Sequence, residues 1–342
     1  MLDGAVAVVK PFNAVRYDEE VAGPLSSLVA PPYDVISPSE RDEYRSRSPY
    51  NVVHLTLPES EGEAARLWRE WLESGVLARE EHPAVWELEQ EFPGPDGYTR
   101  TRRGIVASLR AEPYENGAVL PHERTHSGPK EDRLRLLRAV GAQLEPILVL
   151  YEGPPPVSPS GAAEVETDGV RLRRAGPVDV EQFFADVPLL IADGHHRYET
   201  AVEAGMDIPA VLVSTSDPGL AIQPTHRIAG RVGSVDGTEI ERPGDELPGV
   251  VLYKDGRYRL VDGDGLDVEI VERAAPEDVH YTSSREEAEA AVDRGEAEAA
   301  FLIRPASVSD VFERARRGEV MPQKTTYFSP KLVSGLLFHP LD

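Results

Sequence analysis

Five consecutive polar residues, Asp193-Gly194-His195-His196-Arg197, carry most of the chemistry that this sequence offers. They follow an apolar run, residues 188–192, typical of a buried strand, and they precede residues 198–204, whose pattern predicts a helix ended by Gly205. A strand, a glycine turn and a helix start together form an anion-binding arrangement, because the first N–H groups of the helix point outward and its dipole favours negative charge. The guanidinium of Arg197 can bind two oxygens, and the two histidines add donors or a proton acceptor. The alternative is an ordinary helix start in which Asp193 is the cap.

A second cluster, residues 122–126, matches the H-E-x-x-H pattern of zinc hydrolases. That pattern needs a long helix to hold both histidines on one face, and here Pro121 precedes it and Gly128-Pro129 follows. We therefore expect no metal held directly by a cluster of protein side chains. The sequence instead favours Glu123 as a carboxylate near a bound phosphate, where it accepts a proton from an attacking hydroxyl.

Three further segments are candidates for closing such a site. Thr225-His226-Arg227 follows a predicted strand, residues 210–214, and is expected to cover the same anion from another side. Pro31-Pro32-Tyr33-Asp34 is a stiff loop that presents a phenol and a carboxylate, or else a structural turn. The segment from Gln323 to Phe328, with Lys331, is rich in lysines and hydroxyls that could contact a phosphate. The alternative is that it forms an ordinary polar strand edge. The candidate substrate or closing residues are Tyr33, Asp34, Lys130, Lys324, Tyr327 and Lys331.

Composition limits the classes of protein. The chain of 342 residues has a net charge of −24, which disfavours nucleic-acid partners. It lacks cysteine, which excludes disulfides, thiol catalysis and Cys-ligated zinc. No apolar run approaches the roughly 18 residues of a membrane span, and we expect no signal peptide. We expect a cytoplasmic protein that binds a small-molecule substrate and binds neither nucleic acid nor a membrane. The sequence leaves open whether the chain forms a homo-oligomer.

Hydrophobic periodicity predicts a mixture of helices and strands, hence an α/β (α+β) protein. Ser37-Pro38-Ser39-Glu40 predicts a helix start, and residues 61–74 an amphipathic helix. Residues 85–92 and 98–109 predict a long hairpin. We expect three segments: residues 1–117 with the helix and hairpin, a phosphate-binding core at 118–235, and a segment at 236–342 that closes on the site.

Many ordered motifs resemble those of one bacterial and archaeal family, the domain-of-unknown-function family numbered one thousand and fifteen. They include residues 29–36, 51–54, 122–125, 130–133, 191–201, 224–227 and 321–331. The central part resembles the ParB/sulfiredoxin fold, and the resemblance implies a core of that type with N-terminal and C-terminal α/β elaborations. On that fold, free L-serine kinases have a similar Pro-His-Glu stretch upstream of an Asp-Gly-His-His-Arg turn.

That resemblance implies roles for individual residues. Glu123 matches the catalytic base, with His122 beside it, and Asp193, Gly194, His195, His196 and Arg197 match the turn that holds nucleotide phosphates. The turn, assisted by Thr225, His226 and Arg227, would bind ATP or ADP with Mg²⁺, and Arg197 would stabilise charge on the transferring group. The expected function is a nucleotide-dependent small-molecule kinase acting on free serine or a similar alcohol. Two alternatives stay open: a nucleotide- or phosphometabolite-binding regulator without turnover, and a phosphatase of the phosphoserine type.

Overall fold

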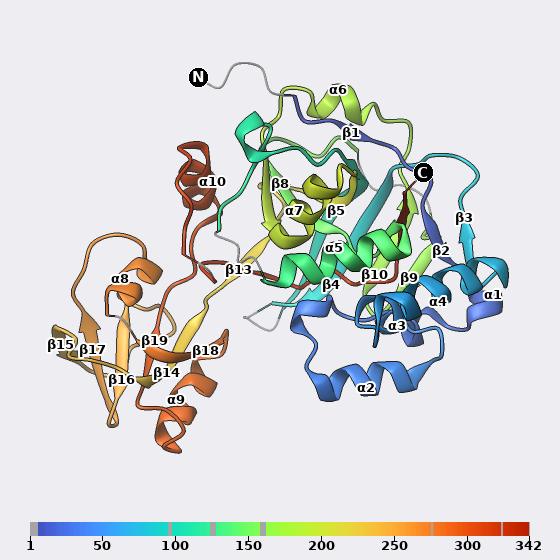
Figure 1. The fold of residues 1–342 in the computed structure, drawn as a ribbon. Coiled ribbons are helices and arrows are strands. Elements are labelled where there is room, and N and C mark those ends of the chain that lie inside the picture. The colour runs from blue at the N-terminus through green and yellow to red at the C-terminus, as the bar shows by residue number, and fades with distance from the viewer. Residues whose placement is uncertain are drawn as a thin grey trace. The chain divides into compact units, whose positions relative to one another are not determined.

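The computed structural model describes residues 6–94, 98–123, 128–157, 162–274, 276–322 and 324–341 (Figure 1). The chain divides into two compact units. Unit 1 comprises Met1–Pro121, Thr125–Leu220 and Pro330–Asp342, and unit 2 comprises His122–Arg124 and Ala221–Ser329.

Unit 1 is built on a mixed nine-stranded sheet in the order β6-β11-β8-β12-β5-β4-β10-β9, with β1 paired to β5. β11 runs antiparallel to β8, whereas β12 runs parallel to it. Its strands are β1 (Val9–Lys10), β4 (Trp86–Pro93), β5 (Thr99–Leu109), β6 (Val119–Leu120), β8 (Ile147–Tyr151), β9 (Val165–Thr167), β10 (Val170–Arg174), β11 (Leu189–Asp193) and β12 (Ile208–Ser214). Two small pairs join β2 (Val15–Tyr17) to β3 (Leu77–Arg79) and β7 (Ala142–Gln143) to β21 (His339–Pro340).

Two helices of unit 1 begin at capping residues that the sequence supplies. In α2 (Pro38–Arg47), Ser37 and Glu40 form the predicted capping box, and in α4 (Glu61–Glu73) the Ser60 side chain accepts a hydrogen bond from the backbone N–H of Glu63. The other helices are α1 (Glu19–Ala22), α3 (Val53–Thr56), α5 (Gly128–Val140), α6 (Val180–Phe184) and α7 (His195–Ala204). α5 packs against both α4 and α7.

The two faces of this sheet are covered by different parts of unit 1. On one face Val180 and Phe184 of α6 and Tyr198 and Ala201 of α7 pack on buried strand residues. On the other face the apolar C-terminal segment, residues 332–337, lies against β4, β10 and β12. The apolar tail that the sequence shows is thus part of the core, because burying it removes leucine and valine side chains from water.

Unit 2 contains a six-stranded sheet in the order β15-β17-β16-β19-β14-β18 and a separate β13–β20 pair. Its strands are β13 (Ala221–Gln223), β14 (His226–Arg231), β15 (Gly237–Ile240), β16 (Val251–Lys254), β17 (Arg257–Val261), β18 (Glu277–Thr282), β19 (Ala299–Leu302) and β20 (Tyr327–Ser329). Its helices are α8 (Asp267–Arg273), α9 (Arg285–Asp293) and α10 (Val308–Arg316). Its core forms around Val250, Leu252 and Phe301.

The α/β class expected from the sequence is confirmed by the mixed sheet and the helices packed on it. The two units differ from the three segments expected at 1–117, 118–235 and 236–342. β5 lies in the first of those segments, yet it is hydrogen-bonded to β12 of the second, so both belong to one sheet. Backbone pairing between distant segments therefore decides the division of the chain. Within the described residues, no helix is long and apolar enough to cross a membrane.

Candidate functional site

The turn at the start of α7 has a conformation that only glycine fits. β11 ends at Asp193 after an irregularity in its pairing with β8, and Gly194 follows with φ +94° as the N-cap residue of α7. A Cβ on Gly194 would lie 2.6 Å from Cγ2 of Ile147 and 3.1 Å from the guanidinium carbon of Arg197. The N-cap residue Gly194 has no side chain that could cap α7. Gly194, and not Asp193, is therefore the N-cap residue of α7, and a helix N-terminus at such a glycine turn favours an anion.

Asp193 lies at the centre of a buried group of three charges. One carboxylate oxygen pairs with Nζ of Lys331, and Oδ2 accepts a hydrogen bond of 2.8 Å from Nη2 of Arg197. Burial opposes ionisation of Asp193, but Lys331 and Arg197 outweigh it, so that its pKa lies below the ordinary value. Two cations and one anion leave a net charge of +1 beside the positive end of α7.

Arg197 holds the turn from inside. Its side chain is 8% exposed, and besides Asp193 it donates to the backbone carbonyl of Pro146 at the start of β8. The guanidinium thus links the end of β11 to the beginning of β8. This geometry gives Arg197 a positioning role in addition to its charge.

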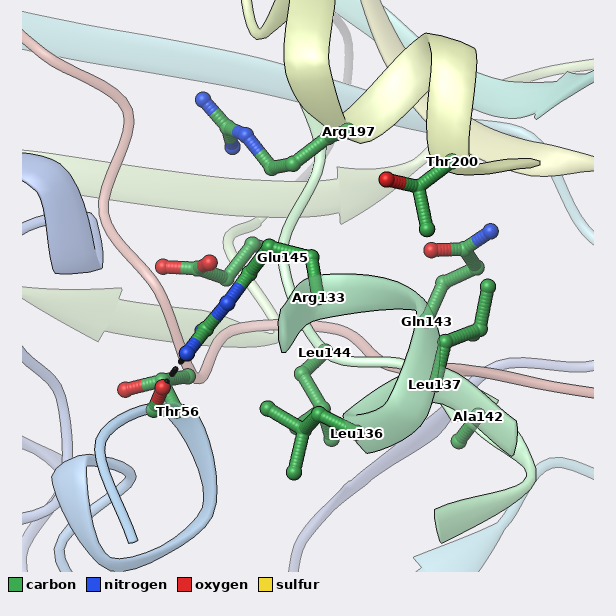
Figure 2. Close-up of a pocket in the computed structure, with 10 residues that line it drawn as sticks. All are labelled: Thr56, Arg133, Leu136, Leu137, Ala142, Gln143, Leu144, Glu145, Arg197 and Thr200. Atoms are coloured by element: carbon green, nitrogen blue, oxygen red, sulfur yellow. Dashed lines mark hydrogen bonds between the residues drawn. The ribbon is translucent and has the colours of Figure 1, made fainter. Parts of the chain in front are cut away.

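A small pocket opens beside Arg197, between α5, α7 and the segment after α5 (Figure 2). Its cavity volume is about 40 Å³, enough for a few water molecules or one small polar group. α5 contributes Arg133, α7 contributes Arg197 and Thr200, and residues 142–145 close the pocket. Arg133 donates a 2.7 Å hydrogen bond to the carbonyl of Thr56, drawn as a dashed line in Figure 2.

Glu145 is a pocket residue that the sequence analysis missed. Its carboxylate accepts hydrogen bonds from the backbone N–H of Tyr33 at 3.0 Å and from the hydroxyl of Ser334 at 2.8 Å. Burial raises its pKa, although Arg197 nearby acts in the opposite direction. The available signal was an acidic residue two positions before the apolar strand β8, where a buried carboxylate needs partners.

The Tyr33-Asp34 loop belongs to this same region of unit 1. The two residues lie in a 3₁₀ turn, Tyr33–Val35, and the Tyr33 ring stacks on the guanidinium of Arg133 at 4.3 Å. Burial raises the pKa of Tyr33. Lys130 forms an ion pair of 3.0 Å with Glu203 and joins α5 to α7. Candidates from four separate sequence segments thus gather around α7.

The remaining candidates form a second cluster, in unit 2. His122 is fully buried, and its Nε2 lies 2.8 Å from Oγ1 of Thr326. The Glu123 carboxylate accepts hydrogen bonds from the backbone N–H groups of Lys324 at 3.2 Å and Thr326 at 3.0 Å, and from the Thr326 hydroxyl at 3.0 Å. Glu123 is therefore held by the segment that the sequence marked for its lysines and hydroxyls.

Arg227 and Thr225 complete this second cluster. The Thr225 hydroxyl donates to the carbonyl of Lys324 at 2.7 Å, and Arg227 donates to the same carbonyl at 3.1 Å. Lys324 has φ +57°, a left-handed conformation that is rare for a side chain of this size. Tyr327 lies in β20, opposite Gln223 of β13.

His226 has an internal role in unit 2. Its Nδ1 accepts a 3.1 Å hydrogen bond from the backbone N–H of Ile303, and burial lowers its pKa to about 4. The imidazole is therefore neutral near pH 7 and holds β14 to the chain after β19.

The expected pairing of Glu123 with the Asp193–Arg197 turn stays a prediction, because the two belong to different units. Arg124, Thr125 and His126 of the H-E-x-x-H pattern, and Gln323, lie outside the described residues.

Comparisons with known proteins add a family and several similar structures. A family model described as "Protein of unknown function (DUF1015)" matches residues 9–242. A free serine kinase in complex with AMP is 17% identical, with 62% of this chain and 84% of that chain covered and a TM-score of 0.42. A conserved hypothetical protein from Pyrococcus furiosus is 19% identical, with 63% of this chain and 89% of that chain covered and a TM-score of 0.40. C-terminally truncated SbnI from Staphylococcus aureus is 12% identical, with 69% of this chain and 87% of that chain covered and a TM-score of 0.44. No curated protein matches the chain.

Proposed function

The chain belongs to the DUF1015 family, whose function is unknown, and from the residues of its own turn we propose that it is a nucleotide-dependent phosphotransferase acting on a small alcohol. The observation that carries the proposal is the start of α7. There the N-cap residue is the left-handed Gly194, which has no side chain to cap the helix, and the charged group below it sums to +1. These features favour a multiply charged anion such as the terminal phosphates of ATP or ADP.

The proposed roles follow from the chemistry of each group. The first N–H groups of α7 bind phosphate oxygens, with His195 and His196 beside them, while Asp193, Arg197 and Lys331 fix the turn and supply positive charge. Asp193 is already bound to two cations. Mg²⁺ would therefore be held chiefly by phosphates and water, which is common for this ion.

Transfer requires a base for the attacking alcohol. We assign this role to Glu123: its carboxylate takes the hydroxyl proton as the oxygen bonds to the terminal phosphorus and the bond to the leaving phosphate breaks. Serine is the first acceptor to test, because the Pro121-His122-Glu123 and Asp193–Arg197 motifs resemble those of free serine kinases.

The test incubates the full chain with Mg²⁺, serine and either ATP or ADP, and measures phosphoserine by mass spectrometry. Lys331→Met should weaken nucleotide binding about tenfold, because it removes one charge from the group below the turn. Lys10→Met is the matched control, since Lys10 is 43% exposed and pairs only loosely with Glu181 at 3.6 Å. Glu123→Gln should abolish product formation while nucleotide binding persists.

Three outcomes would contradict the proposal. Absence of nucleotide binding would remove the phosphate site. Nucleotide binding without product across a panel of hydroxylated metabolites would favour a regulator. Phosphate release from phosphoserine without any nucleotide would favour a phosphatase.

A further inference from the structure

The small pocket beside Arg197 has features that phosphate binding at the turn does not explain. Three separate segments line it with polar side chains: Thr56 at the end of α3, Arg133 on α5 and Glu145 before β8 (Figure 2). Each of these side chains has a hydrogen-bonding atom that no described residue engages. A single ligand group that met all three would explain why they line one pocket.

Thr56 gives the clearest signal. The residue is 1% exposed, and its Oγ1 atom is buried without a hydrogen-bond partner among the described residues. Buried hydroxyl groups are nearly always hydrogen-bonded, because they lose their contacts with water when the chain folds. The hydroxyl of Thr56 lies at the wall of a pocket and is therefore available to a ligand.

Arg133 brings a positive charge that no described carboxylate balances with an ion pair. Its Nη1 donates to the carbonyl of Thr56 at 2.7 Å, and the guanidinium lies over the Tyr33 ring at 4.3 Å. Arg133 is only half-buried, and the described residues accept no hydrogen bond from its Nε or Nη2. A guanidinium with free N–H groups favours a carboxylate or another oxyanion.

Glu145 supplies the third group. Both of its described hydrogen bonds, from the backbone N–H of Tyr33 and the hydroxyl of Ser334, go to Oε1, so Oε2 has no donor among the described residues. Glu145 is 6% exposed, and burial raises its pKa, while Arg197 and Arg133 act in the opposite direction. In the neutral form the proton lies on Oε2, because Oε1 already accepts two hydrogen bonds, and Oε2 becomes a donor.

The size of the pocket limits the ligand group. Its cavity volume is about 40 Å³, and a water molecule needs about 10–15 Å³ of such a volume, so the pocket holds about three non-hydrogen atoms. A carboxylate group has that size, and its two oxygens accept several hydrogen bonds. A phosphate group has two atoms more and does not fit.

We propose that this pocket binds the carboxylate of the acceptor, which makes the phosphorylated alcohol a small hydroxycarboxylic acid. Arg133 and the Thr56 hydroxyl would donate to the carboxylate, and neutral Glu145 would donate through Oε2. The fate of the hydroxyl group rests on the proposed phosphotransferase activity, whereas binding of the carboxylate rests on the pocket alone. Arg197 connects the two sites, because it lines the pocket and is bonded to Asp193 of the turn.

The experiment is calorimetric titration of the full chain without Mg²⁺ and nucleotide, so that no transfer occurs. L-Serine and glycerate both carry the carboxylate and should bind, although glycerate lacks the ammonium group. Ethanolamine lacks the carboxylate and should bind at least about tenfold more weakly than serine. Equal binding of ethanolamine and serine, or no binding of either acid, would overturn the proposal.

Variants assign the binding to this pocket. Arg133→Met should weaken serine binding at least about tenfold, whereas Arg135→Met, on the same helix but with a side chain 58% exposed, should leave it unchanged. Thr56→Val should weaken binding about tenfold without lowering the melting temperature, because the hydroxyl that it removes has no described partner. Thr167→Val is the matched control, since Thr167 on β9 has a buried hydroxyl in the same state.

Glu145→Gln tests which part of serine the pocket recognises. The amide keeps an oxygen for Tyr33 and Ser334 and is a permanently neutral donor, whereas ionised Glu145 repels a second carboxylate. The variant should therefore bind serine a few-fold more tightly than wild-type protein. Weaker binding would assign Glu145 to the ammonium group of serine and overturn the proposal.

Failure of this inference and failure of the proposed function give different results. Phosphorylation of ethanolamine as efficient as that of serine would refute the carboxylate pocket and leave the phosphotransferase standing. Binding of both acids without any transfer from ATP or ADP would refute the phosphotransferase and leave the pocket standing. The ligand series needs no variant, so it tests the pocket even where a substitution prevents folding.

Discussion

Replacing Gly194 by alanine tests the reasoning about the turn most directly. Gly194 has φ +94° and Gly205, at the other end of α7, has φ +67°. A left-handed conformation costs about 1–2 kcal/mol for a residue with a Cβ, so both substitutions carry that cost. Gly205 has no atom within 4 Å of its ideal Cβ position, which makes Gly205→Ala the matched control.

The two positions differ in the space available. At Gly194 the new methyl would lie 2.6 Å from Cγ2 of Ile147, which is fully buried, and 3.1 Å from the Arg197 guanidinium. Overpacking of this kind costs about 1–3 kcal/mol. We therefore expect Gly194→Ala to lower the free energy of unfolding by about 2–5 kcal/mol and Gly205→Ala by about 1–2 kcal/mol.

Urea unfolding followed by circular dichroism measures both losses. A double-mutant cycle with Ile147→Ala identifies the cause, because removing the Ile147 side chain relieves the clash. We expect Ile147→Ala and Gly194→Ala together to cost about 1–3 kcal/mol less than the sum of their separate effects. Equal losses at Gly194 and Gly205, or additive effects in the cycle, would refute the account of the turn.

Three further predictions concern charge. Asp193→Asn should lower the free energy of unfolding by about 3–5 kcal/mol, because it leaves two buried cations without their anion. Glu203→Gln should lower it by at most about 1 kcal/mol, since the pair of Glu203 with Lys130 is half exposed. Thermal unfolding of the two variants measures both losses. Because the pKa of Asp193 is lowered on folding, the loss of stability in Asp193→Asn should persist above the unfolded pKa of about 3.9 and shrink as the pH falls through the folded value. Unfolding of wild-type protein and Asp193→Asn across this pH range measures the loss, and a loss that does not shrink at low pH would contradict the reasoning. Because the pKa of His226 falls to about 4 on folding, wild-type protein should lose up to about 3 kcal/mol as the pH drops from about 6.5 to 4. His226→Asn, which can still accept from Ile303, should lack that part of the loss, and identical pH profiles would contradict the assignment.

Local elements were predictable because their signals are contained in a few neighbouring residues. The capping box of Ser37 and Glu40 starts α2 as expected, and α7 ends at the left-handed Gly205. The hairpin of β4 and β5 follows from two alternating runs around a turn rich in proline and glycine. α5 begins at Gly128, so Gly128 and Pro129 lie inside the first turn of a helix.

Which charged residues meet was not predictable in the same way. The sequence alone determined the α/β class, the glycine turn after a buried strand, and the set of polar segments able to do chemistry, because each depends on short-range pattern. Tertiary structure decided that Lys331 pairs with Asp193 across 138 residues, that Glu145 and Arg133 line the pocket beside the turn, and that Glu123 is bound by residues 324–326. The physical reason is that ion pairs and buried hydrogen bonds form between strands and loops whose neighbours are set by sheet pairing, and a one-dimensional pattern does not record that pairing.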